Sequence, residues 1–196
     1  MNLNDPVATA LLVAEALDQS GQRYALFGGL LLAAYGEPRE TRDADVAVVD
    51  LTAETARQAL EASGLHALVS FDAVTFGGLS VGRVALVGGD EHLGLNVLDL
   101  VRPRSWRYGR VALDRSVRVP LRDRTIQALT ADDFVIFKAL ATRDRDLDDA
   151  ASVLRRSGDL LDVGLIEQEV EALAAEIDDW DIRGHWEAIR ARGGLS

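Results

Sequence analysis

The chain has 196 residues, enough for one sizeable domain or for a core with a smaller helical partner, and its 48% hydrophobic content excludes a disordered protein. It contains no cysteine, so disulfides and thiolate metal sites are excluded, and any metal must use oxygen or histidine ligands. The net charge of −11 argues against wholesale non-specific binding to nucleic acid. The N-terminal segment lacks the basic region of a signal peptide, and no uncharged apolar run reaches the ~18 residues that span a bilayer. We therefore expect a cytoplasmic protein with no membrane partner.

Helices and strands alternate in the first part of the chain. Apolar residues at helical spacing predict the helices, and short apolar runs bounded by glycine predict the strands. In chain order we expect a helix at 6–19, a strand at 24–27, a helix at 30–35, a strand at 43–49 and a helix at 52–63.

The middle of the chain has a strand pattern, and the last third has a helical one. Glycine pairs at 77–78 and 88–89 separate β-branched runs, which predicts hairpin strands at 81–87 and 93–101. Beyond Thr130 we expect helices at 131–142, 146–157, 164–177 and 183–191. The fold class is therefore α/β (α+β): a small mixed-sheet core over residues 1–125, followed by a helical C-terminal half over residues 126–196.

Two acidic residues on the strand predicted at 43–49 are the strongest candidates for chemistry. Residues i and i+2 of a strand point to the same face, so Asp43 and Asp45 project side by side while Ala44 and Val46 face the core. Two neighbouring carboxylates repel each other, and a divalent cation such as Mg²⁺ relieves that repulsion. Ahead of the pair, Gly28-Gly29 opens a helix whose N-terminal N–H groups can approach a phosphate closely.

Further candidates lie downstream. Asp99 sits in an apolar strand and can serve as a third metal ligand or take a proton from an attacking hydroxyl; a surface position at the strand end is the alternative. Lys138 is the only lysine beside twenty arginines, which suggests a need for a compact charge facing a triphosphate, although base composition alone can produce the excess. Asp146 and Asp149 lie at the start of the following helix. The helix dipole alone favours acids there, an explanation that applies more strongly to Asp144 and Asp148 than to Asp146 and Asp149.

A basic segment stands out in this acidic chain. Between residues 102 and 124 only Asp114 and Asp123 are acidic, whereas eight residues are arginine: 102, 104, 107, 110, 115, 118, 122 and 124. One interpretation is the solvated face of a strand and loop. The other is a binding surface for a polyanionic substrate.

Taken together, these motifs resemble the polymerase-β-like nucleotidyltransferases, and more narrowly the branch of AbiEii and MenT-type toxins of toxin–antitoxin pairs. The matching pieces span about two-thirds of the chain: Gly28-Gly29, Arg39-x-Thr41-x-Asp43-x-Asp45, and Lys138 with Arg143, Asp146 and Asp149. The resemblance implies that residues 1–125 form a nucleotidyltransferase core and that residues 126–196 complete the active-site cleft.

The resemblance also implies roles for individual residues. Asp43 and Asp45 would hold magnesium, Lys138 would grip the nucleotide, and Asp146 would support the active site from the helical half. The triphosphate would be lined by Gly28, Gly29, Arg39, Thr41 and Lys138. The chain departs from the family where many members have Gly-Ser, because Gly28-Gly29 lacks the serine hydroxyl.

The implied activity is transfer of a nucleoside monophosphate from a nucleoside triphosphate to an RNA acceptor, the 3′ end of transfer RNA, with release of pyrophosphate. The protein would act as a growth-inhibiting toxin, with a cognate antitoxin that can be a kinase acting on Thr41. Two alternatives stay open: modification of a small hydroxylated molecule such as an aminoglycoside, and a catalytically silent module that binds a nucleotide or a partner.

Overall fold

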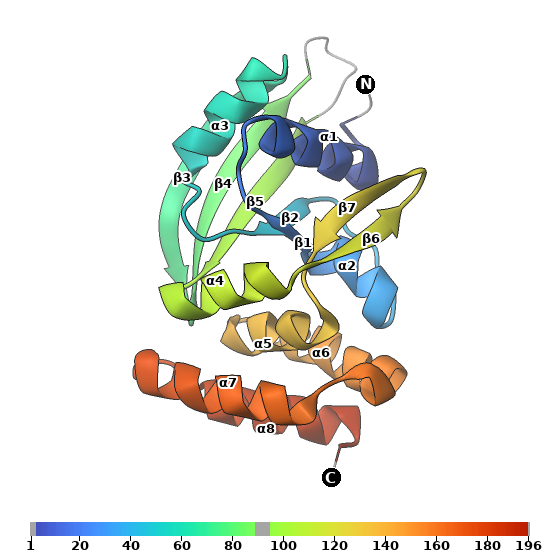
Figure 1. The fold of residues 1–196 in the computed structure, drawn as a ribbon, viewed down its shortest axis with the longest axis vertical. Helices are drawn as coiled ribbons and strands as arrows, with labels where there is room; N and C mark the ends of the chain where they lie inside the picture. Colours follow the sequence, from blue (N-terminus) through green and yellow to red (C-terminus); the bar gives the residue numbers. More distant parts are fainter. Residues whose placement is uncertain (1–2, 89–94, 196) are drawn as a thin grey trace.

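The computed structural model describes residues 3–88 and 95–195, which form a mixed sheet with helices around it (Figure 1). The strands are β1 (Ala25–Phe27), β2 (Ala44–Ala47), β3 (His66–Phe76), β4 (Leu79–Val87), β5 (Leu95–Pro103), β6 (Val117–Leu121) and β7 (Arg124–Ala128). The helices are α1 (Pro6–Gln19), α2 (Gly28–Tyr35), α3 (Ala53–Ala62), α4 (Trp106–Arg115), α5 (Ala131–Leu140), α6 (Asp144–Ser157), α7 (Val163–Glu176) and α8 (Ile182–Gly193), with a short 3₁₀ turn at Gly158–Leu160. The expected fold class is confirmed.

The sheet has the strand order β3-β4-β5-β2-β1-β7-β6. β2 pairs parallel with β5 and antiparallel with β1, while β7 pairs parallel with β1. Ala44 and Val46 are buried and Asp45 is partly exposed, as expected, but Ala47 is also buried, and Asp43 lies just before β2 rather than on it. The short central strands β1 and β2 therefore hold the acidic segment in the middle of the sheet.

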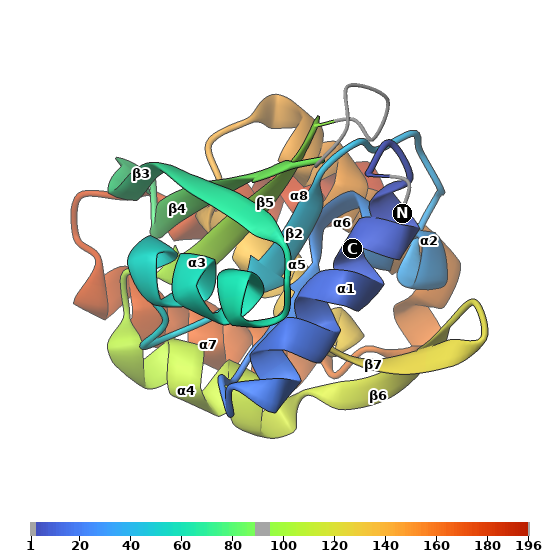
Figure 2. The ribbon, with the colours of Figure 1, turned by 90° about the horizontal axis from the view of Figure 1, so that it is seen from above.

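Helices cover the sheet on different sides. Figures 1 and 2 show α1 and α3 against one face of the sheet. In Figure 1, α5 to α8 lie together below α4. Aromatic contacts join the helical half to the sheet, because the ring of Phe27 lies 5.5 Å from that of Phe134 and 5.2 Å from that of Phe137. α5 therefore packs directly on the end of β1, where the sequence turns into α2.

Helix α6 holds the segment that leads into β2. The Ser152 hydroxyl accepts a hydrogen bond from the Glu37 backbone N–H at 3.1 Å, and the Ser157 hydroxyl donates to the Tyr35 carbonyl at 2.7 Å. Gly36 is required at this contact, because a Cβ there would lie 2.4 Å from the Ser152 hydroxyl oxygen. The position of the acidic segment therefore depends on the helical half as well as on the sheet.

Most expected elements are present, with ends shifted by a few residues. The strand expected at 43–49 is shorter, and residues 93–94 of the strand expected at 93–101 lie outside the described residues. β3, α4 and the β6–β7 hairpin were not expected individually, and β7 continues past residue 125 to pair with β1. In the part of the chain that the structure describes, we find no helix with the length and apolar character to cross a membrane.

Candidate active site

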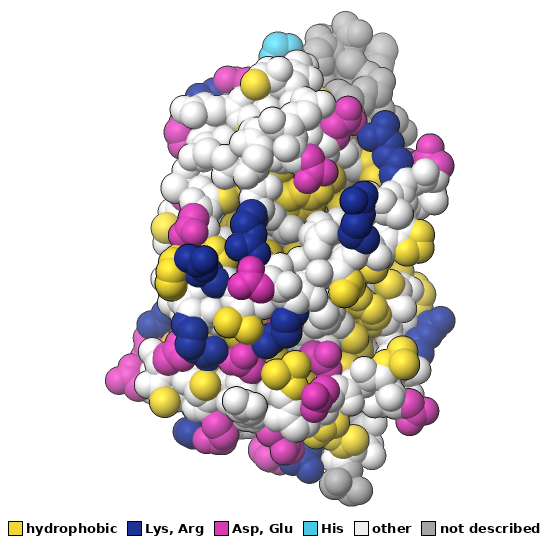
Figure 3. All heavy atoms as spheres, viewed as in Figure 1, with side chains coloured by type: hydrophobic (Ala, Val, Ile, Leu, Met, Phe, Trp, Pro, Cys, Tyr) yellow, Lys and Arg dark blue, Asp and Glu magenta, His cyan; other side chains and the backbone are white. Residues whose placement is uncertain are grey.

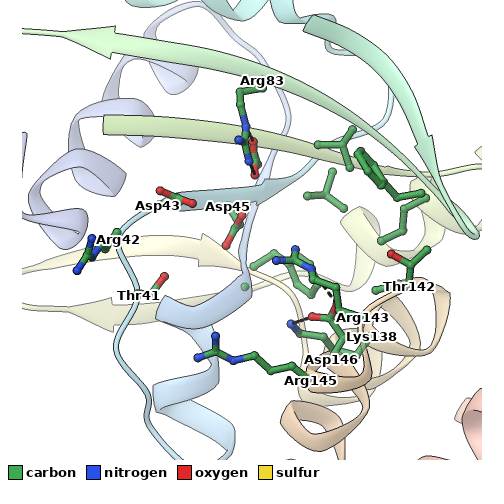
Figure 4. A pocket seen from close by; sticks show the side chains of 18 of the residues that line it. Thr41, Arg42, Asp43, Asp45, Arg83, Lys138, Thr142, Arg143, Arg145 and Asp146 are labelled. Carbon is green, nitrogen blue, oxygen red and sulfur yellow. Dashed lines mark hydrogen bonds and ion pairs between the residues drawn. The ribbon is translucent and has the colours of Figure 1, made fainter. Parts of the chain in front are cut away.

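One cavity of about 790 Å³ collects nearly all the residues that the sequence singled out (Figure 4). It lies between the sheet and the start of the helical half. The expected site residues that line it are Gly28, Arg39, Thr41, Asp43, Asp45, Asp99, Lys138 and Asp146. Gly29 does not line it. The structure thus brings together residues that are far apart in the chain, from Gly28 to Asp146.

Gly28 makes room for the carboxylate of Asp45. Asp45 lies opposite Phe27 in the β1–β2 pair, so the turn into α2 passes directly beside its side chain. Gly28 has φ +66°, and a Cβ there would lie 1.9 Å from Oδ2 of Asp45. Glycine is therefore needed at this position both for its backbone conformation and for the close approach of the acid.

Gly29 leaves space for Thr41 instead. A Cβ at Gly29 would lie 2.7 Å from Cβ and 2.8 Å from Oγ1 of Thr41. A serine at this position would collide with the threonine, so the departure from the Gly-Ser pattern has a steric reason. The Thr41 hydroxyl occupies the neighbouring space and lines the cavity.

Asp45 is the most perturbed acid of the cavity. Burial, and then the negative charges of Asp99 and Asp43, raise its pKa to about 6, against an opposing effect of Lys138. Asp99 lies directly beside it, because Asp45 and Asp99 are partners in the parallel β2–β5 pair. Ionised Asp45 is therefore held at an energetic cost that a bound cation would offset.

Asp99 already has a cationic partner. Arg83 lies opposite Asp99 in the β4–β5 pair and donates hydrogen bonds to both carboxylate oxygens, each at 2.7 Å. The Arg83 guanidinium also lies 5.5 Å from the centre of the Phe71 ring. Asp99 is adjacent to the Asp43–Asp45 pair, but its oxygens are occupied by this arginine.

Lys138 is buried in a network of charges at the α5–α6 end of the cavity. Its ammonium group donates to Asp146 Oδ1 at 2.6 Å and to Asp149 Oδ2 at 2.9 Å, and only 3% of its side chain is exposed. Asp149 also accepts two hydrogen bonds of 3.1 Å from Arg39. Burial acts to raise the pKa of Asp149, but Arg39 and Lys138 outweigh it and lower that pKa. The network ties Arg39, just ahead of β2, to α6.

Two arginines at the cavity have no partner among the described residues. Arg42 and Arg145 make no hydrogen bond or ion pair within residues 3–88 and 95–195, and both are exposed. Arg143 is 83% exposed, and its Nε lies 3.5 Å from Asp146 Oδ2. Figure 4 shows Arg143 and Arg145 extending toward the side of the cavity that carries Asp45. These guanidinium groups are available to an anionic ligand.

The arginine segment at 102–124 is built differently. Six of its eight arginines form ion pairs with acids from other parts of the chain: Arg102, Arg104, Arg107, Arg115, Arg122 and Arg124. Arg107 and Arg115 both contact Glu169, which joins α4 to α7. Figure 3 shows basic and acidic side chains interleaved over the lower part of this face. Most of the segment's charge is therefore used to hold elements together.

The donor set of the cavity fits magnesium better than other common metals. Across the described ranges, no cluster of three or more acidic or histidine residues is arranged to enclose a metal. Magnesium is usually held by one or two carboxylates together with substrate phosphates and water. Asp43 and Asp45 provide such a pair. Burial, and then the charges of Asp99 and Asp43, raise the pKa of Asp45 to about 6, and a bound cation would act against this shift.

Several residues of the cavity were missed by the sequence reasoning. Phe71 and Phe76 form part of its wall from β3, and Arg83 reaches it from β4. The apolar run before Gly77-Gly78 is the signal for β3, because a glycine pair between two apolar runs is typical of a hairpin. Two register shifts in β3, at residues 69–71 and 71–74, break the alternation and obscure that signal.

Comparisons with known proteins bear on the fold. No protein-family model and no curated protein sequence matches the chain. Among solved structures, the chain is similar to an antigenic nucleotidyltransferase-like protein from Paracoccidioides brasiliensis, with a TM-score of 0.52 and 18% identity over 95% of this chain and 93% of that one. It is also similar to a protein of H. pylori provisionally assigned as a nucleotidyltransferase, with a TM-score of 0.53 and 10% identity over 96% and 92% of the two chains. Two structures of the antibiotic-resistance factor ANT(2″)-Ia match with lower TM-scores of 0.45 and 0.48 and 12% identity each.

The chain therefore has the fold of nucleotidyltransferases along nearly its whole length. Within that fold, the cavity brings an acidic pair, a glycine turn and unpaired arginines together. At sequence identities of 18% and 10%, these two structures show a shared fold and do not assign an activity to this chain.

Proposed function

We propose that the protein is a metal-dependent nucleotidyltransferase that transfers a nucleoside monophosphate from a nucleoside triphosphate to an RNA acceptor. The observation that carries this proposal is the acidic pair, with Asp45 against Gly28 and Asp43 in the same cavity. Arg42 and Arg145 also line this cavity and have no partner among the described residues. Carboxylates that share a divalent cation next to basic groups are suited to phosphoryl chemistry, which depends on positioning and on charge stabilisation.

Each side chain has a role in this proposal. Asp43 and Asp45 would hold the magnesium ion, which supplies positive charge to the phosphates and to the charge that develops during transfer. Arg42 and Arg145 would bind the triphosphate from the open side. The acceptor hydroxyl oxygen forms a bond to the α-phosphorus, the bond from that phosphorus to the α–β bridging oxygen breaks, and pyrophosphate leaves. Asp99 would take the hydroxyl proton once Arg83 releases one of its two hydrogen bonds.

Support for RNA as the acceptor comes from the cavity wall rather than from residues 102–124. Phe71 and Phe76 present aromatic side chains there, and 44% of Phe76 is exposed. Aromatic side chains next to arginines bind single-stranded nucleic acid by stacking on bases and contacting phosphates. We propose the 3′ end of transfer RNA as the acceptor because such an end is single-stranded and carries a free hydroxyl.

The proposal extends to a biological role through the motif resemblance. The protein would be the cytoplasmic toxin of a toxin–antitoxin pair, and the antitoxin would be a kinase acting on Thr41. Thr41 lies against Gly29 beside the acidic pair. A phosphate there would add about two negative charges and repel a triphosphate, which would silence the enzyme.

The test is incorporation of label from each of the four nucleoside triphosphates into total RNA, with magnesium, by the wild type and by Asp45→Asn. We expect one or more nucleotides to label an RNA band, and the variant to lose this activity. A folded wild-type protein that labels no RNA with any nucleotide would contradict the proposal. Labelling of an added aminoglycoside without any RNA would retain the enzyme class and replace the acceptor.

Two further measurements test the roles of the cavity residues. Arg42→Gln with Arg145→Gln should weaken labelling of any acceptor, because these two side chains would bind the triphosphate. Arg104→Gln is the matched control, because Arg104 is already paired with Asp179. Growth arrest on expression that persists with Asp45→Asn would instead indicate a silent binding module.

A further inference from the structure

One oxygen at the end of the cavity lacks a hydrogen bond. Asp146 is 6% exposed and lines the cavity from the first turn of α6. Its Oδ1 accepts from Lys138, whereas its Oδ2 is buried and has no hydrogen-bond partner within residues 3–88 and 95–195. Arg143 Nε lies 3.5 Å from this oxygen, on a side chain that is 83% exposed. Buried acceptors nearly always have a donor, so this oxygen calls for an explanation.

The surrounding network fixes the carboxylate of Asp146 in place. Lys138 divides its hydrogen bonds between Asp146 Oδ1 and Asp149 Oδ2, and Arg39 holds Asp149 from the other side. The orientation of Asp146 is therefore set by buried partners. Figure 4 shows the contact between Lys138 and Asp146 at the α5–α6 end of the cavity, across from Asp45.

The chemistry of this oxygen selects which part of a nucleotide it can contact. Phosphate oxygens are negatively charged acceptors, so a carboxylate oxygen repels them. The hydrogen-bond donors of a nucleoside triphosphate are its ribose hydroxyls and the N–H groups of its base. Base N–H groups differ in position among the four nucleotides, whereas the ribose hydroxyls are common to all.

We propose that Asp146 Oδ2 accepts a hydrogen bond from a ribose hydroxyl of the bound nucleoside triphosphate, so that the protein selects ribonucleotides over deoxyribonucleotides. This inference rests on the proposed function and adds the orientation of the nucleotide. The sugar lies toward α6, and the phosphates lie toward Asp43, Asp45 and the unpaired arginines. Lys138 then acts as a positioning residue for Asp146 rather than as a direct contact to the triphosphate.

The experiment measures equilibrium binding by calorimetry, with magnesium and without an acceptor. ATP, 2′-deoxy-ATP and 3′-deoxy-ATP are compared on the wild type, on Asp146→Asn and on the control Asp148→Asn. Asp148 lies on the same helix, is exposed and pairs with Arg192. Because hydrogen bonds to charged groups are among the stronger ones, we expect the wild type to bind ATP about tenfold to a hundredfold more tightly than one of the two deoxy analogues. The analogue that loses affinity identifies the hydroxyl.

Asp146→Asn should lower that ratio, because a neutral amide replaces the charged acceptor, while Asp148→Asn keeps it. Inorganic tripolyphosphate should bind equally to all three proteins, since it has no sugar. Equal binding of ATP and both deoxy analogues by the wild type would overturn the inference, as would a ratio that Asp146→Asn leaves unchanged.

A second measurement covers the case in which Asp146→Asn does not fold. An ATP analogue with fluorine in place of the identified hydroxyl cannot donate a hydrogen bond, so the wild type should bind it as weakly as the deoxy analogue. Binding as tight as that of ATP would overturn the inference. The proposed function fails separately: ATP that binds with the expected ratio but labels no RNA contradicts transfer to RNA and retains the sugar contact.

Discussion

Replacing Asp45 by asparagine should stabilise the protein in the absence of metal, and more so as the pH rises. In the folded protein, burial and the charges of Asp99 and Asp43 raise the pKa of Asp45 from 3.8 to about 6. A change of one pKa unit corresponds to ~1.4 kcal/mol, so ionised Asp45 costs the folded state about 3 kcal/mol. Asparagine has nearly the same shape and no charge, and it removes this cost.

The direction of the pH dependence follows from proton binding. Between pH 3.8 and about 6 the folded state binds more protons at Asp45 than the unfolded state does. The stability contributed by this group is therefore fully present below pH 3.8 and is lost as the pH rises through 6. The free energy of unfolding of Asp45→Asn minus that of the wild type should increase with pH, with roughly half of the ~3 kcal/mol change falling between pH 5 and 8.

Urea unfolding followed by tryptophan fluorescence at pH 5, 6, 7 and 8, in a chelating buffer, measures this difference. Trp180 and Trp186 lie in the helical half, and Trp186 is buried, so their emission reports on global unfolding. Magnesium added at pH 8 should stabilise the wild type and leave Asp45→Asn unchanged. A difference that stays flat across the pH range, or a variant that is less stable than the wild type at pH 8, would refute the electrostatic argument.

Three other substitutions test the cavity. Gly28→Ala should destabilise the protein and weaken Mn²⁺ binding measured by electron paramagnetic resonance, because its Cβ displaces the adjacent acid. Gly21→Ala is the control, since Gly21 has φ +69° and open space around it, and should show only the ~1–2 kcal/mol cost of its backbone conformation. Lys138→Met should lower the free energy of unfolding by about 3–5 kcal/mol, because two buried carboxylates of α6 lose their shared cation; a loss below 1 kcal/mol in urea unfolding would contradict the buried network. Arg83→Met removes the cationic partner of Asp99 and should tighten Mn²⁺ binding several-fold, because a second carboxylate then faces the acidic pair. Weaker Mn²⁺ binding by this variant would contradict that expectation.

The sequence predicted the parts of the site that depend on local periodicity. The alternation of strand residues correctly predicted that Ala44 and Val46 lie in the core, because neighbouring side chains of a strand point to opposite sides. Asp43 lies just before β2 rather than on it, and it lines the same cavity as Asp45. The long helices of the last third were predicted because their apolar residues recur at helical spacing. Lys138 was noticeable through composition alone.

The role of the Gly28-Gly29 turn needed the tertiary structure. The sequence favoured close approach of a phosphate, whereas the coordinates show the acid of β2 and the hydroxyl of Thr41 filling the space that side chains at these positions would need. The two segments are brought together by the β1–β2 pairing, which joins residues about eighteen positions apart. No pattern of neighbouring residues in the sequence predicts which side chain will lie against a glycine.

What the sequence by itself determined is the mixed α/β class, the buried residues Ala44 and Val46 of the strand beside the acidic pair, and the helical pattern that follows. What only the tertiary structure decided is which charges meet. Arg83 faces Asp99 through strand register, Lys138 is enclosed by Asp146 and Asp149, and most arginines of residues 102–124 are paired with acids from distant segments. The physical reason is range: periodicity assigns a side chain to a face, whereas charge pairing, burial and pKa depend on neighbours that strand order and helix packing bring together.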